Sequence, residues 1–156
     1  MELFQHPLYK EDLQRISTLP LPWEKLKNSS VLISGATGMI GSFLVDLILF
    51  QNASAELNCH VYALGRNEKK ATIRFSAHWN DPLFHFTCCD INQGIPLSLP
   101  NVEYIIHAAS NTHPVAYATD PIGTVTTNII GTNNLLEFAS QHHSHRFVFT
   151  STVEIY

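Results

Sequence analysis

Three glycines spaced three residues apart, Gly35, Gly38 and Gly41, form the part of this sequence best suited to bind phosphate. They follow the apolar run 31–33 and precede an amphipathic run, which predicts a strand, a tight turn and a helix start. Such a turn directs free backbone N–H groups and the positive end of the helix dipole at one point, where a pyrophosphate can bind. Gly35 allows the tight bend, Gly38 lets the backbone approach the phosphates, and Gly41 lets the helix lie close to the strand.

A dinucleotide is the ligand that this turn predicts, with a plain strand-to-helix turn as the alternative. The residues expected to contact it are Gly35, Thr37, Gly38, Met39, Ile40 and Gly41. After the second expected strand, a site for NAD normally offers an acid to the adenosine ribose, but here Gly65 stands there and Arg66 follows. An Arg beside a missing acid can accommodate a 2′-phosphate, so the cofactor is NAD or NADP and Arg66 favours NADP. A merely solvated Arg66 is the alternative.

Small residues follow the fourth expected strand. Ala108, Ala109 and Ser110 would let a dinucleotide lie across the strand ends without collision. Further along, Gly131 falls in the middle of a predicted helix, where a glycine costs about 1 kcal/mol relative to alanine. That cost predicts close packing at Gly131.

The elements that position these residues are five apolar segments alternating with helical ones. Strands are expected at residues 30–34, 59–64, 84–89, 104–108 and 147–150. Helices are expected at 39–51, at 68–79 and after Asp120, which would cap a helix with Pro121 in its first turn. This alternation predicts an α/β fold, a doubly wound parallel sheet of order 3-2-1-4-5 with right-handed crossovers. Ligands of such sheets bind at the carboxyl ends of the strands.

Two of the helices carry apolar residues at helical spacing, which predicts one buried face for each. The first face is Ile40, Leu44, Leu47 and Ile48, and the second is Ile122, Val125, Ile129, Leu136 and Ala139. Residues 1–28 are expected to form an N-terminal arm with a short helix at about 10–17, packed on a dinucleotide-binding domain at 29–156.

The glycine segment resembles the extended branch of the short-chain dehydrogenase/reductase superfamily. Later segments resemble its sugar-nucleotide epimerases, decarboxylases and dehydratases, the NAD-dependent epimerase/dehydratase family, in the same order over residues 29–156. By this resemblance, Asp90 accepts a hydrogen bond from the adenine amino group and Ile91 packs on the ring; a turn-forming Asp90 is the alternative. His113 matches a histidine near the substrate. Asn128, in a segment like Asn-x-x-Gly-Thr, stabilises the active-site backbone and is counted with the cofactor-binding residues.

Residues 151–156, Ser-Thr-Val-Glu-Ile-Tyr, closely resemble a catalytic segment of dTDP-glucose 4,6-dehydratases and UDP-glucuronate decarboxylases. The resemblance implies that Thr152 hydrogen-bonds the sugar 4-oxygen as its hydride leaves, and that Glu154 reaches the sugar at C5. Val153 departs from the dehydratase pattern, because Val cannot donate a proton to a departing hydroxyl. Epimerisation or decarboxylation is therefore favoured over dehydration.

One feature of the family has no counterpart in this sequence, the general base of a Tyr-x-x-x-Lys motif. None of the five tyrosines has a Lys four residues later; they are Tyr9, Tyr62, Tyr104, Tyr117 and Tyr156. The resemblance places the catalytic Tyr some two dozen residues after Tyr156. We therefore expect an N-terminal fragment or a truncated reading frame that lacks the substrate-binding half and is inactive alone.

The predicted function is the NAD(P)-binding part of a nucleotide-sugar epimerase, decarboxylase or dehydratase that acts through a 4-keto-sugar. A non-enzymatic module that senses NAD(P)H is one alternative, but such a sensor has no need of Thr152 and Glu154. An NADPH-dependent carbonyl reductase is another, against which His113 and Glu154 point to a sugar. The partner expected is a nucleotide sugar, with a homo-oligomer as a further possibility.

Composition narrows the class of protein. The chain has 156 residues, 45% of them hydrophobic, and a net charge of −4 with its nine Lys and Arg scattered, so neither nucleic acid nor membrane is an expected partner. No signal peptide or membrane-length apolar run is seen, which predicts a cytoplasmic protein. Cys59, Cys88 and Cys89 lack zinc spacing and are expected to be reduced core thiols, and the three histidines of 142–145 lie in a polar linker, so no metal site is expected.

Overall fold

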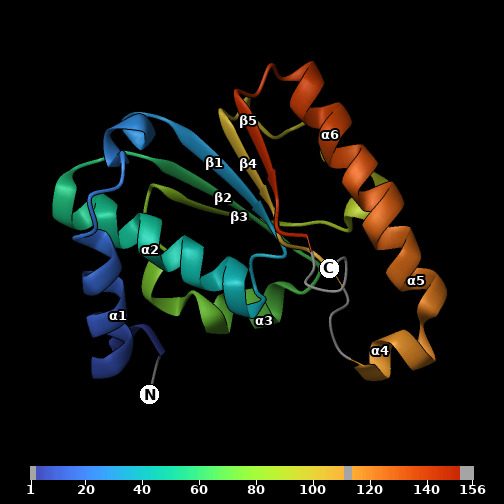
Figure 1. The fold of residues 1–156 in the computed structure, drawn as a ribbon, viewed down its shortest axis with the longest axis horizontal. Coiled ribbons are helices and arrows are strands. Elements are labelled where there is room, and N and C mark those ends of the chain that lie inside the picture. Colours follow the sequence, from blue (N-terminus) through green and yellow to red (C-terminus); the bar gives the residue numbers. More distant parts are fainter. Residues whose placement is uncertain (1–2, 111–113, 152–156) are drawn as a thin grey trace.

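The computed structural model describes residues 3–110 and 114–151. Its centre is a sheet in the order β3-β2-β1-β4-β5, with every neighbouring pair parallel (Figure 1). The strands are β1 (Ser30–Ser34), β2 (His60–Gly65), β3 (Phe84–Cys88), β4 (Tyr104–His107) and β5 (Arg146–Phe149). The predicted fold class and strand order are therefore confirmed, because each apolar segment pairs with the neighbours that right-handed crossovers dictate.

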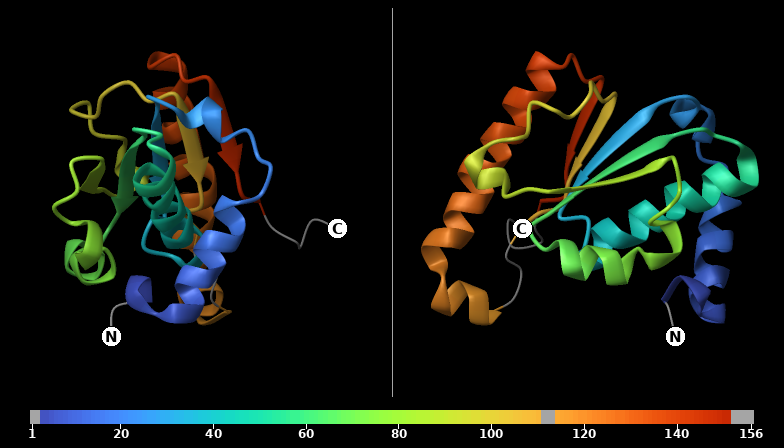
Figure 2. Two further views of the ribbon diagram at one scale, coloured as in Figure 1. Left: turned by 90° about the vertical axis from the view of Figure 1, so that its left-hand side faces the viewer. Right: turned by 180° about the vertical axis from the view of Figure 1, so that it is seen from behind.

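Helices cover both faces of the sheet (Figure 2). One face carries α1 (Pro7–Ser17), α2 (Met39–Ala55) and α3 (Glu68–Arg74), and the other carries α6 (Thr132–Gln141). The π-helical turn η5 (Thr127–Gly131), α5 (Pro121–Thr126) and α4 (Pro114–Thr119) continue from α6 toward and past the carboxyl ends of the strands. Short 3-10 turns are η1 (Leu3–Gln5), η2 (Trp23–Leu26), η3 (Ser76–His78) and η4 (Ile91–Gln93). Each face encloses its own apolar core. Among the described helices, none is both long and apolar enough to cross a bilayer.

The N-terminal helix α1 packs on the outside of α2. Leu13 of α1 is fully buried, and the Tyr9 hydroxyl donates to Asp46 of α2 at 2.6 Å. Because α2 lies between the sheet and α1, it is buried over more than one face. The prediction of a single buried face for this helix, formed by Ile40, Leu44, Leu47 and Ile48, therefore included too few residues. Val45 and Leu49 are buried, whereas Ile40 at the start of the predicted stripe is exposed.

The prediction of which face is buried in the helical segment α5, η5 and α6 is wrong. Of that face, Ile122, Val125, Ile129 and Leu136 are exposed, by 46–79%. The buried residues of this segment are instead Thr124, Thr127, Gly131, Leu135 and Phe138. Small side chains are needed there, because a Cβ on Gly131 would lie 2.7 Å from Cδ1 of Ile91 in η4. The close packing predicted at Gly131 is thus confirmed, and it sets the orientation of the helix.

Other boundaries differ in detail. The helix expected at 68–79 ends at Arg74, and after Phe75, which is fully buried, the chain continues as the 3-10 turn η3. Asp120 caps α5 as predicted, its side chain accepting from the backbone N–H of Gly123 at 2.9 Å. All three cysteines are free, but Cys88 is exposed, so the prediction of a core thiol fails there. Cys88 ends β3, the edge strand of the sheet, where its side chain has no covering layer.

Candidate functional site

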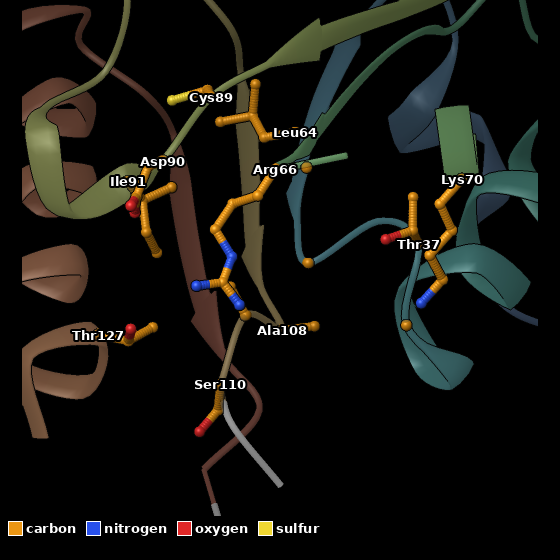
Figure 3. Close-up of a pocket in the computed structure, with 14 residues that line it drawn as sticks. Thr37, Leu64, Arg66, Lys70, Cys89, Asp90, Ile91, Ala108, Ser110 and Thr127 are labelled. Carbon is orange, nitrogen blue, oxygen red and sulfur yellow. The ribbon is translucent and has the colours of Figure 1, made fainter. Parts of the chain in front are cut away.

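A pocket of about 220 Å³ lies at the carboxyl ends of the strands (Figure 3). Its walls come from the turn after β1, the ends of β2 and β3, the segment after β4 and the turn η5. The lining residues are Gly35, Thr37, Gly38, Leu64, Gly65, Arg66, Lys70, Cys89, Asp90, Ile91, Ala108, Ala109, Ser110 and Thr127. This is the edge at which doubly wound sheets bind ligands, where the strand order reverses between β1 and β4.

The glycine turn forms one wall of the pocket and needs its glycines for different reasons. Gly35 has φ +68°, and a Cβ there would lie 2.5 Å from the carbonyl oxygen of Ala108. Gly41 presses against the backbone of Gly35 and Ala36, so α2 lies close to the end of β1. Gly38 caps α2 in extended conformation, and the first N–H groups of α2 lack partners within the helix. The wall therefore offers donors and the positive end of a 17-residue helix.

Two basic side chains border the opening. Arg66 and Lys70 are exposed, and α3 is capped by Asn67, whose side chain accepts from the N–H of Lys70 at 2.9 Å. In Figure 3 the Arg66 side chain extends across the pocket between Ile91 and Thr37. At Gly65 a Cβ would lie 3.3 Å from the Phe86 ring, so the end of β2 is closely packed.

The wall opposite the glycine turn combines one carboxylate with apolar groups. Asp90 caps η4 by accepting from the N–H of Asn92 at 3.0 Å, which is the turn-forming role weighed as its alternative. Ile91 is buried beside it. Burial, followed by the charge of Asp90, raises the pKa of the Cys89 thiol, which therefore stays neutral. Among the described lining residues, Asp90 is the single acid.

The floor is formed by the exit of β4. The Ala108 N–H donates to the Ser34 carbonyl at 3.1 Å, which continues the pairing of β4 with β1 into the pocket. The Ser110 hydroxyl donates to Asn128 Oδ1 at 2.9 Å. Asn128 is exposed on η5 and outside the lining, so it contacts the site through Ser110.

The structure brings together most of the residues predicted to form the site. Those that line the pocket are Gly35, Thr37, Gly38, Arg66, Asp90, Ile91, Ala108, Ala109 and Ser110. Gly41 packs behind the turn, and the side chains of Met39 and Ile40 line a second cavity beside the N-terminal arm. His113, Thr152 and Glu154 lie outside the described residues.

The lining residues that sequence reasoning did not assign to the site are Leu64, Gly65, Lys70, Cys89 and Thr127. Lys70 and Thr127 are the two of these that add a charged or hydroxyl side chain. Lys70 follows Arg66 closely, and Asn67 between them is a residue type that caps helices, so the sequence places both cations about the start of a helix. That signal was available. No sequence signal pointed to Thr127, because its position in the pocket depends on the π-helical turn.

Comparisons with known proteins agree with this geometry. The profile of the NAD dependent epimerase/dehydratase family matches residues 31–156. UDP-glucuronic acid decarboxylase 4 of Arabidopsis thaliana is 33% identical over 132 residues, which cover 85% of this chain and 28% of that protein. UDP-glucuronic acid decarboxylase 1 of Xenopus tropicalis is 29% identical over 150 residues, covering 94% of this chain and 33% of that protein. This chain therefore spans about a third or less of both relatives.

A solved structure shows the same fold. The UDP-glucuronic acid 4-epimerase from Bacillus cereus, in complex with UDP-glucuronic acid and NAD, superposes with a TM-score of 0.68 at 26% identity. The match covers 81% of this chain and 41% of that one.

Proposed function

This chain belongs to the NAD dependent epimerase/dehydratase family, and from that premise we propose that its pocket binds the nicotinamide dinucleotide of a nucleotide-sugar epimerase or decarboxylase. The observation that carries the proposal is the contact of Gly35 with Ala108. It brings the glycine turn and the small-residue segment together at the point where the strand order reverses.

The residues present fit a dinucleotide. A side chain at Gly35 or Gly41 would collide with backbone, so glycine at both positions lets the turn pack tightly. The start of α2 offers N–H donors to a pyrophosphate. Asp90 and Ile91 would hold the adenine, and Arg66 with Lys70 would face the ribose. When bound, the dinucleotide supplies a hydride acceptor. The protein's part is to orient it across Ala108, Ala109 and Ser110.

We propose NADP as the form that binds. Two cations at the opening and no acid at Gly65 suit a 2′-phosphate better than a free 2′-hydroxyl. The only carboxylate of the described lining, Asp90, follows β3 and not β2, so it does not take the place of the missing acid at Gly65.

The substrate that we propose is a nucleotide sugar. Thr152 would hydrogen-bond the sugar 4-oxygen, Glu154 would reach C5 and His113 would lie beside the sugar. With Val153 unable to donate a proton, epimerisation or decarboxylation is proposed over dehydration. The Arabidopsis relative is by name a decarboxylase and the Bacillus cereus protein a 4-epimerase, which supports this choice.

Two further parts of the proposal concern the cell and the assembly. A cytoplasmic location is supported by the three free thiols, which persist in reducing compartments. A homo-oligomer is supported by the exposed aliphatic residues of α5, η5 and α6, since contiguous apolar surface marks interaction sites.

Calorimetric titration with NADP+ and NAD+ tests the cofactor site. We expect the unaltered chain to bind NADP+ more tightly, and Arg66→Ala combined with Lys70→Ala to weaken NADP+ at least about tenfold while changing NAD+ less. The matched control is Lys69→Ala, an exposed cation of α3 outside the pocket, which should leave both affinities unchanged. Binding of neither dinucleotide would contradict the proposed site, and an equal loss of both in the double variant would contradict the preference for NADP.

A further inference from the structure

His107, the last residue of β4, is fully buried and lies outside the pocket lining. It nevertheless forms hydrogen bonds with residues beside three of the pocket's walls, the glycine turn, the exit of β4 and the π-helical turn. Its Nδ1 is 2.7 Å from the hydroxyl of Ser34, the residue before the glycine turn, and its Nε2 is 2.9 Å from the hydroxyl of Thr132, the first residue of α6, directly after the π-helical turn.

The hydrogen bonds determine which ring nitrogen carries the proton. The backbone N–H of Ala109 points at Nδ1 at 3.4 Å and can only donate, so Nδ1 must present its lone pair. The Thr132 hydroxyl gives its own proton to the carbonyl of Asn128 at 2.7 Å. Thr132 Oγ1 is therefore free to accept from Nε2–H. One consistent chain of donors and acceptors results, with a neutral imidazole protonated at Nε2.

We infer that His107 is a positioning residue for the dinucleotide pocket, and that its neutral Nε2–H form ties the glycine turn, the exit of β4 and the π-helical turn into one arrangement. For its ligand this inference rests on the proposed function. His107 itself would not touch the dinucleotide.

The three groups that hydrogen-bond to His107 each belong to, or adjoin, a wall of the pocket. Ser34 precedes Gly35, Ala109 lines the floor, and Thr132 holds the Asn128 carbonyl of η5. Loss of His107 or of the Thr132 hydroxyl would let three walls shift relative to one another. Because the Gly35 turn already lies against Ala108 backbone, a small shift there changes where a pyrophosphate can bind.

The network also makes the arrangement sensitive to acid. Ser34 and Ala109 both donate to Nδ1, so a second ring proton would meet two donors. The elements packed against the ring present Ser34, Thr132, Phe147 and Phe149, none of which carries a charge. Burial lowers the pKa of His107. The stability that its neutral form contributes is therefore fully present above the ordinary histidine pKa of about 6.5 and is lost as pH falls below it.

Thr132→Val tests the inference, because it keeps the side-chain volume and removes the acceptor of Nε2–H. We expect dinucleotide affinity to fall about tenfold, and amide hydrogen exchange in segments 35–38 and 108–110 to rise. Thr132→Ser restores the hydroxyl and should stay within about twofold of the unaltered chain. The matched control is Thr72→Val, which removes the same type of hydroxyl bond, to the Glu68 carbonyl, on the exposed face of α3.

Two outcomes would overturn the inference. One is a Thr132→Val variant that loses thermal stability but keeps its affinity and its exchange in both segments. The other is a long-range 15N–1H NMR spectrum in which the His107 ring of the ligand-free chain is protonated at Nδ1 near pH 7. Hydrogen exchange and NMR need no ligand, so they test the role of His107 even if no dinucleotide binds. Failure to bind a dinucleotide would contradict the proposed function and not the role of His107.

Discussion

Gly35 and Gly38 belong to one turn but differ in what a side chain would meet. At Gly35 the backbone has positive φ and a Cβ would strike Ala108. At Gly38 the backbone is extended, and the nearest atom to a Cβ is the Gly35 carbonyl oxygen at 3.2 Å. The first glycine is thus required by the fold, and the second keeps open the space in front of α2.

Gly38→Val should therefore weaken dinucleotide binding far more than it destabilises the fold. We expect affinity to fall at least about tenfold by calorimetry, because the side chain fills the space of the phosphates. The melting temperature should change by less than about 4 °C. Gly35→Val is the contrasting variant and should lower the melting temperature strongly. Unchanged affinity in Gly38→Val would show that the pyrophosphate does not bind at this turn.

At the scale of elements, a buried carboxylate joins the N-terminal arm to the helices of one face. Asp46 of α2 is fully buried and accepts from the Tyr9 hydroxyl of α1, from Arg74 of α3 and from His78 Nε2 of η3 at 3.1 Å. Burial, together with the bond to Asp46, raises the pKa of Tyr9, so its hydroxyl stays a donor. Four elements depend on this one side chain.

Asp46→Ala should destabilise the chain by about 3 kcal/mol, because it leaves the Arg74 cation, whose side chain is only 14% exposed, without its carboxylate partner. Urea-induced unfolding followed by tryptophan fluorescence measures this change. The control is Asp12→Ala, which breaks the exposed pair of Asp12 with Arg15 in α1 and should cost less than about 1 kcal/mol. Similar losses in both variants would contradict the role given to the buried cluster.

At the scale of the whole molecule, apolar surface is exposed at two places, among others, in the described part of the chain. One is the stripe on α5, η5 and α6, in which Ile122 is 79% and Ile129 65% exposed. The other is β5, which pairs only with β4 in the described part of the chain and exposes about half of Val148 and Phe149. An unpaired apolar edge and an apolar stripe both promote association.

We expect the chain to self-associate, so that sedimentation velocity gives a mass above 17.5 kDa that rises with concentration. Ile122→Lys combined with Ile129→Lys should raise the dissociation constant at least about tenfold, since a partner would have to bury two charges. Leu97→Lys changes an exposed leucine outside the stripe and should have no effect. A monomer at every concentration would refute this expectation.

Local sequence was sufficient for the features that depend on neighbouring residues. The glycine turn, the Asp120 cap and the alternation of strands and helices follow from backbone conformation and from the connections between elements. The parallel order then placed Gly35, Arg66, Asp90 and Ala108 at one edge, because the strands of a parallel sheet all end on the same side.

Other features depended on contacts between residues far apart in the chain. Ile122 and Ile129 have helical spacing, yet they face outward, because Gly131 is the residue that can approach Ile91. The pairing of His107 with Thr132 likewise appears only once β4 and the π-helical turn lie together. The helical spacing of apolar residues in a sequence indicates that a helix has an apolar side. Which side is buried depends on the volume available against the rest of the protein, and that volume exists only in the folded chain.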